Sequence, residues 1–74
     1  PSASFKASIS AYEKARSLRP DFMLNYLELA KAYKKNDQED KALEMLRIIQ
    51  GLPIHTEDDP RIRKEAADLI RKWE

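Results

Sequence analysis

The chain has 74 residues and a formal net charge of +1, with 36% charged residues, one glycine and no cysteine. A chain of this length makes at most one domain, so we expect a single domain over residues 1–74, and it buries only about 60% of its unfolded surface. The composition excludes a disulfide framework and a thiolate metal site, and the balanced charge argues against non-specific nucleic-acid binding. We expect no specific nucleic-acid partner. Since no apolar run is long enough, we also expect no transmembrane segment.

The first predicted helix covers residues 3–18. Its apolar residues Phe5, Ile9, Tyr12 and Ala15 recur at spacings of three and four, which places them in one stripe of a helix. Pro20 ends this segment, because the residue before a proline is driven out of the α region.

Two further helices are predicted over residues 22–35 and 38–50. Asp21 and Asp37 are the expected N-caps, and Asn36 is the expected left-handed residue at the end of the first of these helices. Gly51 follows the second helix at the position where a helix-terminating glycine is common, and Pro53 comes two residues later.

A closing helix is predicted over residues 57–73, with Thr56 or Asp59 as its cap and Pro60 in its first turn. Its apolar stripe contains Ile62, Ala66 and Leu69. Four short helices joined by turns of a few residues predict an all-α fold of antiparallel helical hairpins.

The sequence also repeats itself. Ser8 and Tyr12 are matched by Ala42 and Leu46 about 34 residues later, which is the period of the tetratricopeptide repeat. Tyr26-x₂-Leu29-Ala30-x₂-Tyr33 followed by Ala42-x₃-Leu46 resembles the consensus of that repeat, with Tyr26 in place of Trp and Ala30 in place of Gly. The resemblance implies a tetratricopeptide-like α-solenoid fragment: the second helix of one repeat (3–18), a full repeat (22–50) and a closing helix (57–73).

A narrower resemblance covers roughly the last two-thirds of the chain. The order Ala-Lys-x-Tyr, a Lys-Ala helix ending in Leu-Pro, Thr-Glu-Asp-Asp and Lys-Glu-Ala is similar to the carboxy-terminal part of the regulator of microtubule dynamics family. That resemblance implies a non-enzymatic, intracellular and cytoplasmic protein, with family members tied to microtubules and mitochondria.

The tetratricopeptide resemblance implies a binding surface, because the first helix of each repeat lines the concave face. Cations exceed carboxylates there, so we expect a protein or peptide partner of acidic character, and the narrower resemblance suggests tubulin tails. The alternative is that these charges only solvate the helices. The expected peptide-binding residues are Leu24, Leu27, Lys31, Lys34, Lys35, Arg61, Lys64, Arg71 and Lys72.

The first helix would lack its usual partner if the chain begins within a repeat. Phe5, Ile9 and Tyr12 would then be partly uncovered, which predicts either a missing upstream repeat or a homo-oligomer formed through this helix. Two alternatives to a binding module stay open: a structural cap that ends a longer helical array, and a designed repeat protein without a natural ligand.

No constellation for catalysis or for a cofactor is present in the sequence. His55 is the only histidine and has no cysteine beside it, and the acidic run Glu57–Asp59 fits a helix start better than a metal loop. The serines lack a paired base at a recognisable spacing. We therefore expect a protein that is not an enzyme, with no catalytic residue, metal site or cofactor.

Overall fold

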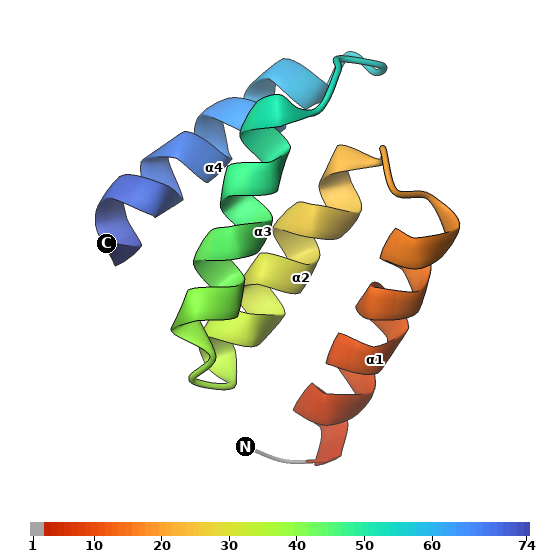
Figure 1. Cartoon of the computed structure of the whole chain (residues 1–74), viewed down its shortest axis with the longest axis vertical. Coiled ribbons are helices and arrows are strands. Elements are labelled where there is room, and N and C mark those ends of the chain that lie inside the picture. Colours follow the sequence, from red (N-terminus) through yellow and green to blue (C-terminus); the bar gives the residue numbers. More distant parts are fainter. Residues whose placement is uncertain (1–2) are drawn as a thin grey trace.

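The computed structural model describes residues 3–74, with side chains from Phe5 onward. In this range the chain forms four helices and no strand: α1 (Ala3–Leu18), α2 (Met23–Lys35), α3 (Glu39–Gly51) and α4 (Asp59–Trp73) (Figure 1). The all-α prediction is confirmed, and each helix begins and ends within two residues of its predicted range.

The helices run in alternating directions and form a flat molecule of 33 × 28 × 15 Å. In Figure 1, α1 and α4 lie at opposite sides, with α2 and α3 between them. Helix α2 packs against each of the other three helices, whereas the backbone of α1 lies close to that of α2 alone and reaches α3 only through the Arg16 side chain. The edge position of α1 leaves most of its surface exposed.

The core lies where α2, α3 and α4 meet. Met23, Leu29, Leu46 and Ile49 are fully buried, and Ile62 joins them from α4. The small residues Ala30, Ala42 and Ala66 are also completely covered. Because a methyl side chain adds little thickness, these alanines allow the helix backbones to approach closely.

The residue pairs that the repeat matches to each other, Ser8 with Ala42 and Tyr12 with Leu46, were expected to have similar surroundings. That expectation is wrong, because the members of each pair differ in burial. Ala42 and Leu46 are completely covered, whereas Ser8 is exposed and Tyr12 is half-buried. The physical reason is that α3 packs against both α2 and α4, while the backbone of α1 lies close to that of α2 alone.

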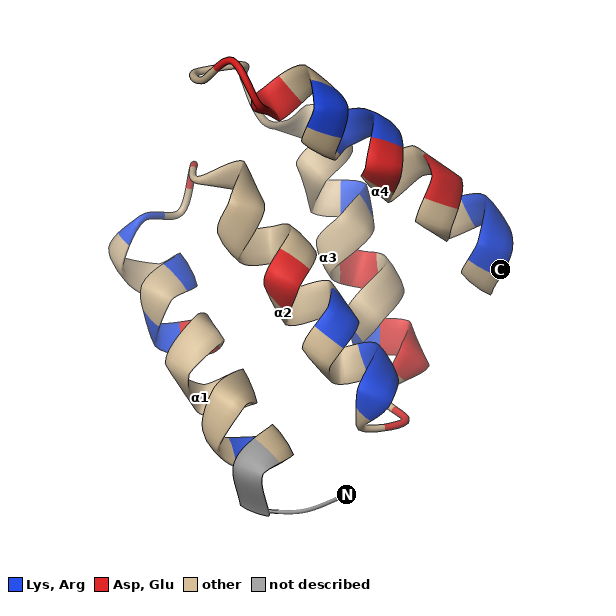
Figure 2. Cartoon of the chain, turned by 180° about the vertical axis from the view of Figure 1, so that it is seen from behind, with Lys and Arg blue, Asp and Glu red and all other residues tan. Residues whose placement is uncertain are grey.

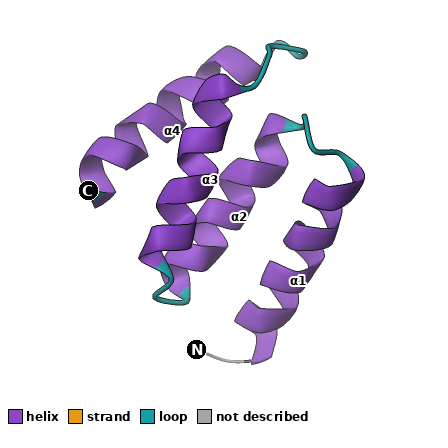
Figure 3. Cartoon of the chain, viewed as in Figure 1, coloured by secondary structure: helices purple, strands orange, loops and turns teal. Residues whose placement is uncertain are grey.

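Helix α2 ends at Lys35 as expected, but the left-handed residue that follows it is one position later than predicted. Asn36 has a φ of −95° and continues the turn, and it is Asp37 that adopts the left-handed conformation, with a φ of 60°. The amide of Gln38 donates to the carbonyl of Tyr33, and the amide of Asp37 donates to that of Lys34, which is the Schellman pattern of helix termination. These bonds form the tight turn at the α2–α3 junction (Figure 3).

The other predicted ends also differ in detail. Gly51 is the last residue of α3 and has no positive φ, so it is not the left-handed terminator that we expected. Asp21 makes no capping hydrogen bond to α2, whose N-cap is Phe22; its carboxylate instead lies 3.4 Å from His55 Nε2. Asp21 and His55 therefore bring the α1–α2 and α3–α4 loops together.

No helix within residues 3–74 combines the length and the apolar composition that crossing a membrane requires.

Candidate protein-interaction surface

The outward face of α2 is the centre of the candidate surface. Leu24, Glu28, Lys31 and Lys35 follow one another at spacings of four, three and four, and all are exposed or half-buried. Figure 2 views the molecule from this side, with α1 and α4 flanking α2 and with charged positions along both α2 and α4. We refer to this side of the molecule as the α2 face.

Leu27 does not belong to this surface. Its side chain is only 2% exposed, because it points into the core formed with α3 and α4, so its expected role in peptide binding is wrong. Leu24, by contrast, is 38% exposed and remains available.

Four of the seven expected cations already have carboxylate neighbours. Lys31 Nζ lies 2.9 Å from Glu65 Oε2 on α4, and Lys34 Nζ lies 2.6 Å from Glu39 Oε1 at the start of α3. Arg61 and Arg71 pair within α4 and its N-terminal turn, with Asp58 and Asp68 respectively. Exposed pairs of this kind each contribute about 0.2–1 kcal/mol, so a ligand can displace them at modest cost.

The remaining cations, Lys35, Lys64 and Lys72, are exposed and make no ion pair with any residue of the described range. They carry the positive excess that the sequence suggested. Lys34 is further restrained, because its ammonium lies 5.5 Å from the centroid of the Trp73 ring, which favours a cation over its face. Lys35 is thus the freest cation on α2.

The residues expected to mediate self-association are covered to different extents. Ile9 is 8% exposed because α2 packs over it, so it is not available to a second copy. Phe5 and Tyr12 are half-buried and line a hollow of about 170 Å³ between α1 and α2.

The α1–α2 hollow is a feature that sequence reasoning missed. Ser8 joins Phe5 and Tyr12 on its α1 side, and the α2 side consists of Glu28, Lys31, Ala32 and Lys35. The sequence placed the aromatic residues and the lysines on separate surfaces. Only the rotation of α1 about α2 brings them together, and the stripe of α1 could not reveal that rotation.

Two contacts outside the hollow tie α1 to the helices beside it. The Tyr33 hydroxyl donates a hydrogen bond to the Glu13 carboxylate, and burial, reinforced by this bond, raises the pKa of Tyr33 to about 12. The Arg16 guanidinium lies 5.8 Å from the centroid of the Tyr26 ring and reaches Met45 of α3. Tyr33 therefore stays protonated at neutral pH and acts as a structural donor.

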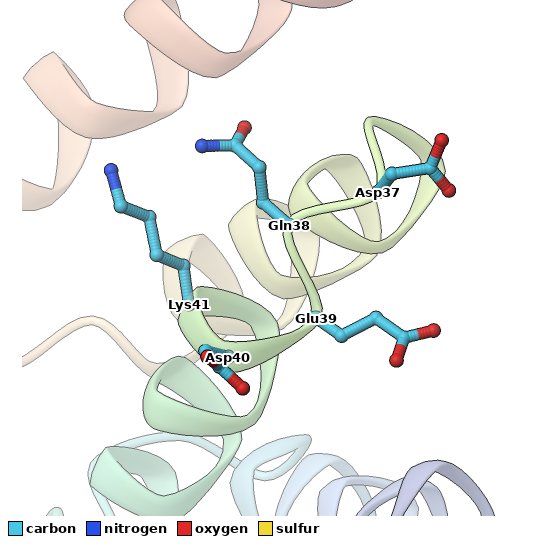
Figure 4. A pocket seen from close by; sticks show the side chains of 5 residues that line it. All are labelled: Asp37, Gln38, Glu39, Asp40 and Lys41. Atoms are coloured by element: carbon cyan, nitrogen blue, oxygen red, sulfur yellow. The ribbon is translucent and has the colours of Figure 1, made fainter.

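A larger hollow of about 450 Å³ lies at the α2–α3 turn and is lined by Asp37, Gln38, Glu39, Asp40 and Lys41. Figure 4 shows that these side chains point in different directions. All five are consecutive residues of one turn, and they do not converge on a common point. We therefore assign this hollow no binding role.

Asp59, the first residue of α4, is the one charged residue that is buried within the described range. The N-cap of α4 is Asp58 and makes no side-chain capping bond, so the expected cap at Thr56 or Asp59 is wrong, and Asp59 instead holds the loop that precedes the helix. Its carboxylate accepts hydrogen bonds from the amides of His55 (2.8 Å) and Thr56 (3.0 Å) and from the Thr56 hydroxyl (2.9 Å). The His55 amide in particular holds the pKa of Asp59 below its usual range. Within the described residues, no group of three or more His, Asp or Glu side chains is placed to hold a metal ion.

Comparison with known proteins extends the resemblance over the entire chain. The family model "Regulator of microtubule dynamics protein 1-3" matches residues 1–74. Regulator of microtubule dynamics protein 1 from Mus musculus is 35% identical over 95% of this chain, and the protein of that name from Pongo abelii is 34% identical over 99%. The human protein is 32% identical over 99%.

The chain spans about a quarter of the length of these relatives, between 23% and 24%. No solved structure matches it significantly. These relatives are named as regulators of microtubule dynamics. The match over its full length shows that the chain belongs to the regulator of microtubule dynamics protein 1–3 family.

Proposed function

We propose that the chain is a non-enzymatic protein-interaction module that binds an acidic peptide segment on its α2 face. The observation that carries the proposal is the position of Lys35 and Lys31 at the edge of the α1–α2 hollow, where Lys35 is exposed and has no carboxylate neighbour among the described residues. Lys64 and Lys72 extend the positive surface along α4. Clustered cations of this kind attract acidic segments and accelerate their association.

As part of this proposal, we assign the chain a tetratricopeptide-like arrangement, which the packing of α2 against α3 supports. Small residues at Ala30 and Ala42 lie where α2 and α3 pack closely, as the helix pair of one repeat requires. In such arrays the first helix of each repeat faces the ligand, which assigns α2 and α4 to the binding side.

The names of the relatives suggest which acidic segment binds. They are called regulators of microtubule dynamics, and tubulin carries acidic tails, so we propose a tubulin tail as the partner. The association of this chain with microtubules or mitochondria, in the cytoplasm, is part of the same proposal.

Charge reversal tests the proposal. The double variant Lys31→Glu, Lys35→Glu is compared with Lys14→Glu, Lys41→Glu, which changes the net charge equally on exposed positions of α1 and α3. Fluorescence anisotropy measures binding of a labelled glutamate-rich peptide at low and high salt. We expect the first variant to lose about ten-fold or more in affinity and the control to lose less, with the difference shrinking as salt screens the charges. Equal losses in both variants would refute a localised site.

A structural cap of a longer helical array is the second candidate. The observation that favours it is the exposed outer surface of α1, a helix whose backbone lies close to that of α2 alone and which ends at Leu18, 73% exposed. If a longer natural chain binds the peptide and this segment contributes nothing to the affinity, the cap is the better description. Family membership favours a natural chain over a designed one.

A further inference from the structure

We infer that the α1–α2 hollow holds one aromatic side chain of the bound peptide, so that the ligand is an acidic segment with an aromatic anchor. This inference rests on the proposed function and adds to it the identity of the residue that fixes the peptide in place. Its evidence is the shape, lining and charge of the hollow.

The hollow exists because α2 presents a small residue opposite α1. Ala32 is 8% exposed and forms part of the lining, while Phe5 and Tyr12 stand beside it as half-buried rings. No large side chain of the described chain fills the space between them. A partner residue that enters the hollow would therefore cover apolar surface that α1 and α2 leave uncovered.

The volume of about 170 Å³ suits a single ring. Aromatic walls favour an aromatic occupant further, because rings gain energy in edge-to-face and offset arrangements beyond the area that they bury. The opening to solvent allows the peptide backbone to remain outside.

The charged side chains that line the hollow change from negative to positive along α2. Glu28, Lys31 and Lys35 follow one another toward the carboxyl end of α2, with the carboxylate at one end and the lysines at the other. Glu28 repels acidic residues at its end, whereas Lys35 attracts them. The carboxylates of the ligand should therefore lie next to the aromatic anchor on the Lys35 side.

The test uses three short peptides: a glutamate-rich peptide with a central phenylalanine, the same peptide with alanine at that position, and a version in which glutamine replaces every glutamate. Binding is measured with the full chain and with Ala32→Leu, which fills the hollow from the α2 side. Ser8→Phe fills it from an exposed position, so it keeps the test valid if Ala32→Leu disturbs folding. Ala7→Leu, exposed on α1 and outside the hollow lining, is the matched control.

We expect the phenylalanine peptide to bind about ten-fold more tightly than the alanine peptide, because one ring leaves water. Ala32→Leu and Ser8→Phe should abolish this difference without changing the affinity for the alanine peptide, and Ala7→Leu should preserve it. If both glutamate peptides bind equally to every variant, the aromatic anchor is refuted while the proposed function stands.

Two other outcomes also overturn the inference. If neither glutamate peptide binds more tightly than the glutamine peptide, the proposed function fails together with the anchor. If light scattering instead shows a dimer that Ser8→Phe converts to a monomer, the occupant of the hollow is a second copy of this chain.

Discussion

Removing the charge of Glu65 should strengthen the binding of an acidic peptide. Glu65 Oε2 lies 2.9 Å from Lys31 Nζ, so it competes with any ligand carboxylate for this ammonium. In the variant Glu65→Gln that competition ends, while Lys31 and the shape of the surface are kept. A gain of function is more informative than a loss, because damage to the fold does not produce it.

The size of the gain follows from the exposure of the pair. The Lys31 and Glu65 side chains are 40% and 36% exposed, so the pair is screened by solvent. Exposed ion pairs contribute about 0.2–1 kcal/mol, which corresponds to an affinity gain of about 1.4- to 5-fold at low salt. Arg61 also loses a weak neighbour at 4.0 Å but keeps Asp58 at 3.7 Å.

Fluorescence anisotropy with the labelled glutamate-rich peptide measures the effect, with Glu44→Gln as the control. Glu44 is exposed on α3, so its substitution changes the net charge equally without touching Lys31. We expect a gain for Glu65→Gln that exceeds that of Glu44→Gln and that high salt removes. The reasoning is refuted if Glu65→Gln weakens binding or if both variants gain equally.

Three further predictions concern stability, measured by chemical or thermal unfolding. Leu46→Ala should lower the free energy of unfolding by about 2–5 kcal/mol, because the side chain is completely buried. The control Leu18→Ala, at an exposed position, should change it by less than about 0.5 kcal/mol. Equal effects of the two variants would contradict the described core. Gly51→Ala should stabilise the chain by about 0.4–1 kcal/mol. Gly51 is helical without a positive φ, and an added Cβ meets no atom within 4 Å. Destabilisation would contradict the helical conformation of Gly51. Asp59 has a lowered pKa, so its contribution to stability is present above about pH 4 and is lost as the pH falls toward the folded-state pKa. Unfolding titrations of wild type and Asp59→Asn from about pH 6 to about pH 2 should show a shallower loss for the variant, and parallel curves would exclude this role.

Much of the fold was predictable because the helices are strongly patterned and separated by clear stop signals. Pro20 and Pro53 each stand two residues after the end of a helix, and the apolar stripes of α2 and α3 identify core residues such as Leu29 and Leu46. The detailed helix ends were less predictable. Asn36 and Asp37 both tolerate left-handed backbone, and the left-handed conformation of Asp37 is the one that accompanies the hydrogen bond from the Gln38 amide to the Tyr33 carbonyl.

The candidate surface was predictable in its charge but not in its shape. The spacing of Lys31 and Lys35 places them on one face of α2, yet Leu27 also satisfied the expected pattern and is buried in the core. Whether Leu27 is exposed or buried depends on how the helices pack together, which local spacing does not specify. The same is true of the hollow, which requires the rotation of α1 that brings Phe5 and Tyr12 to the side of α2 that carries Ala32.

An amide-resolved NMR titration with the glutamate-rich phenylalanine peptide shows which residues the peptide contacts. We expect saturable shifts concentrated in two segments, residues 5–12 of α1 and 28–35 of α2, which line the hollow and carry its lysines. Shifts concentrated at Asp37–Lys41 in the α2–α3 turn, or no saturable shifts at all, would contradict this expectation.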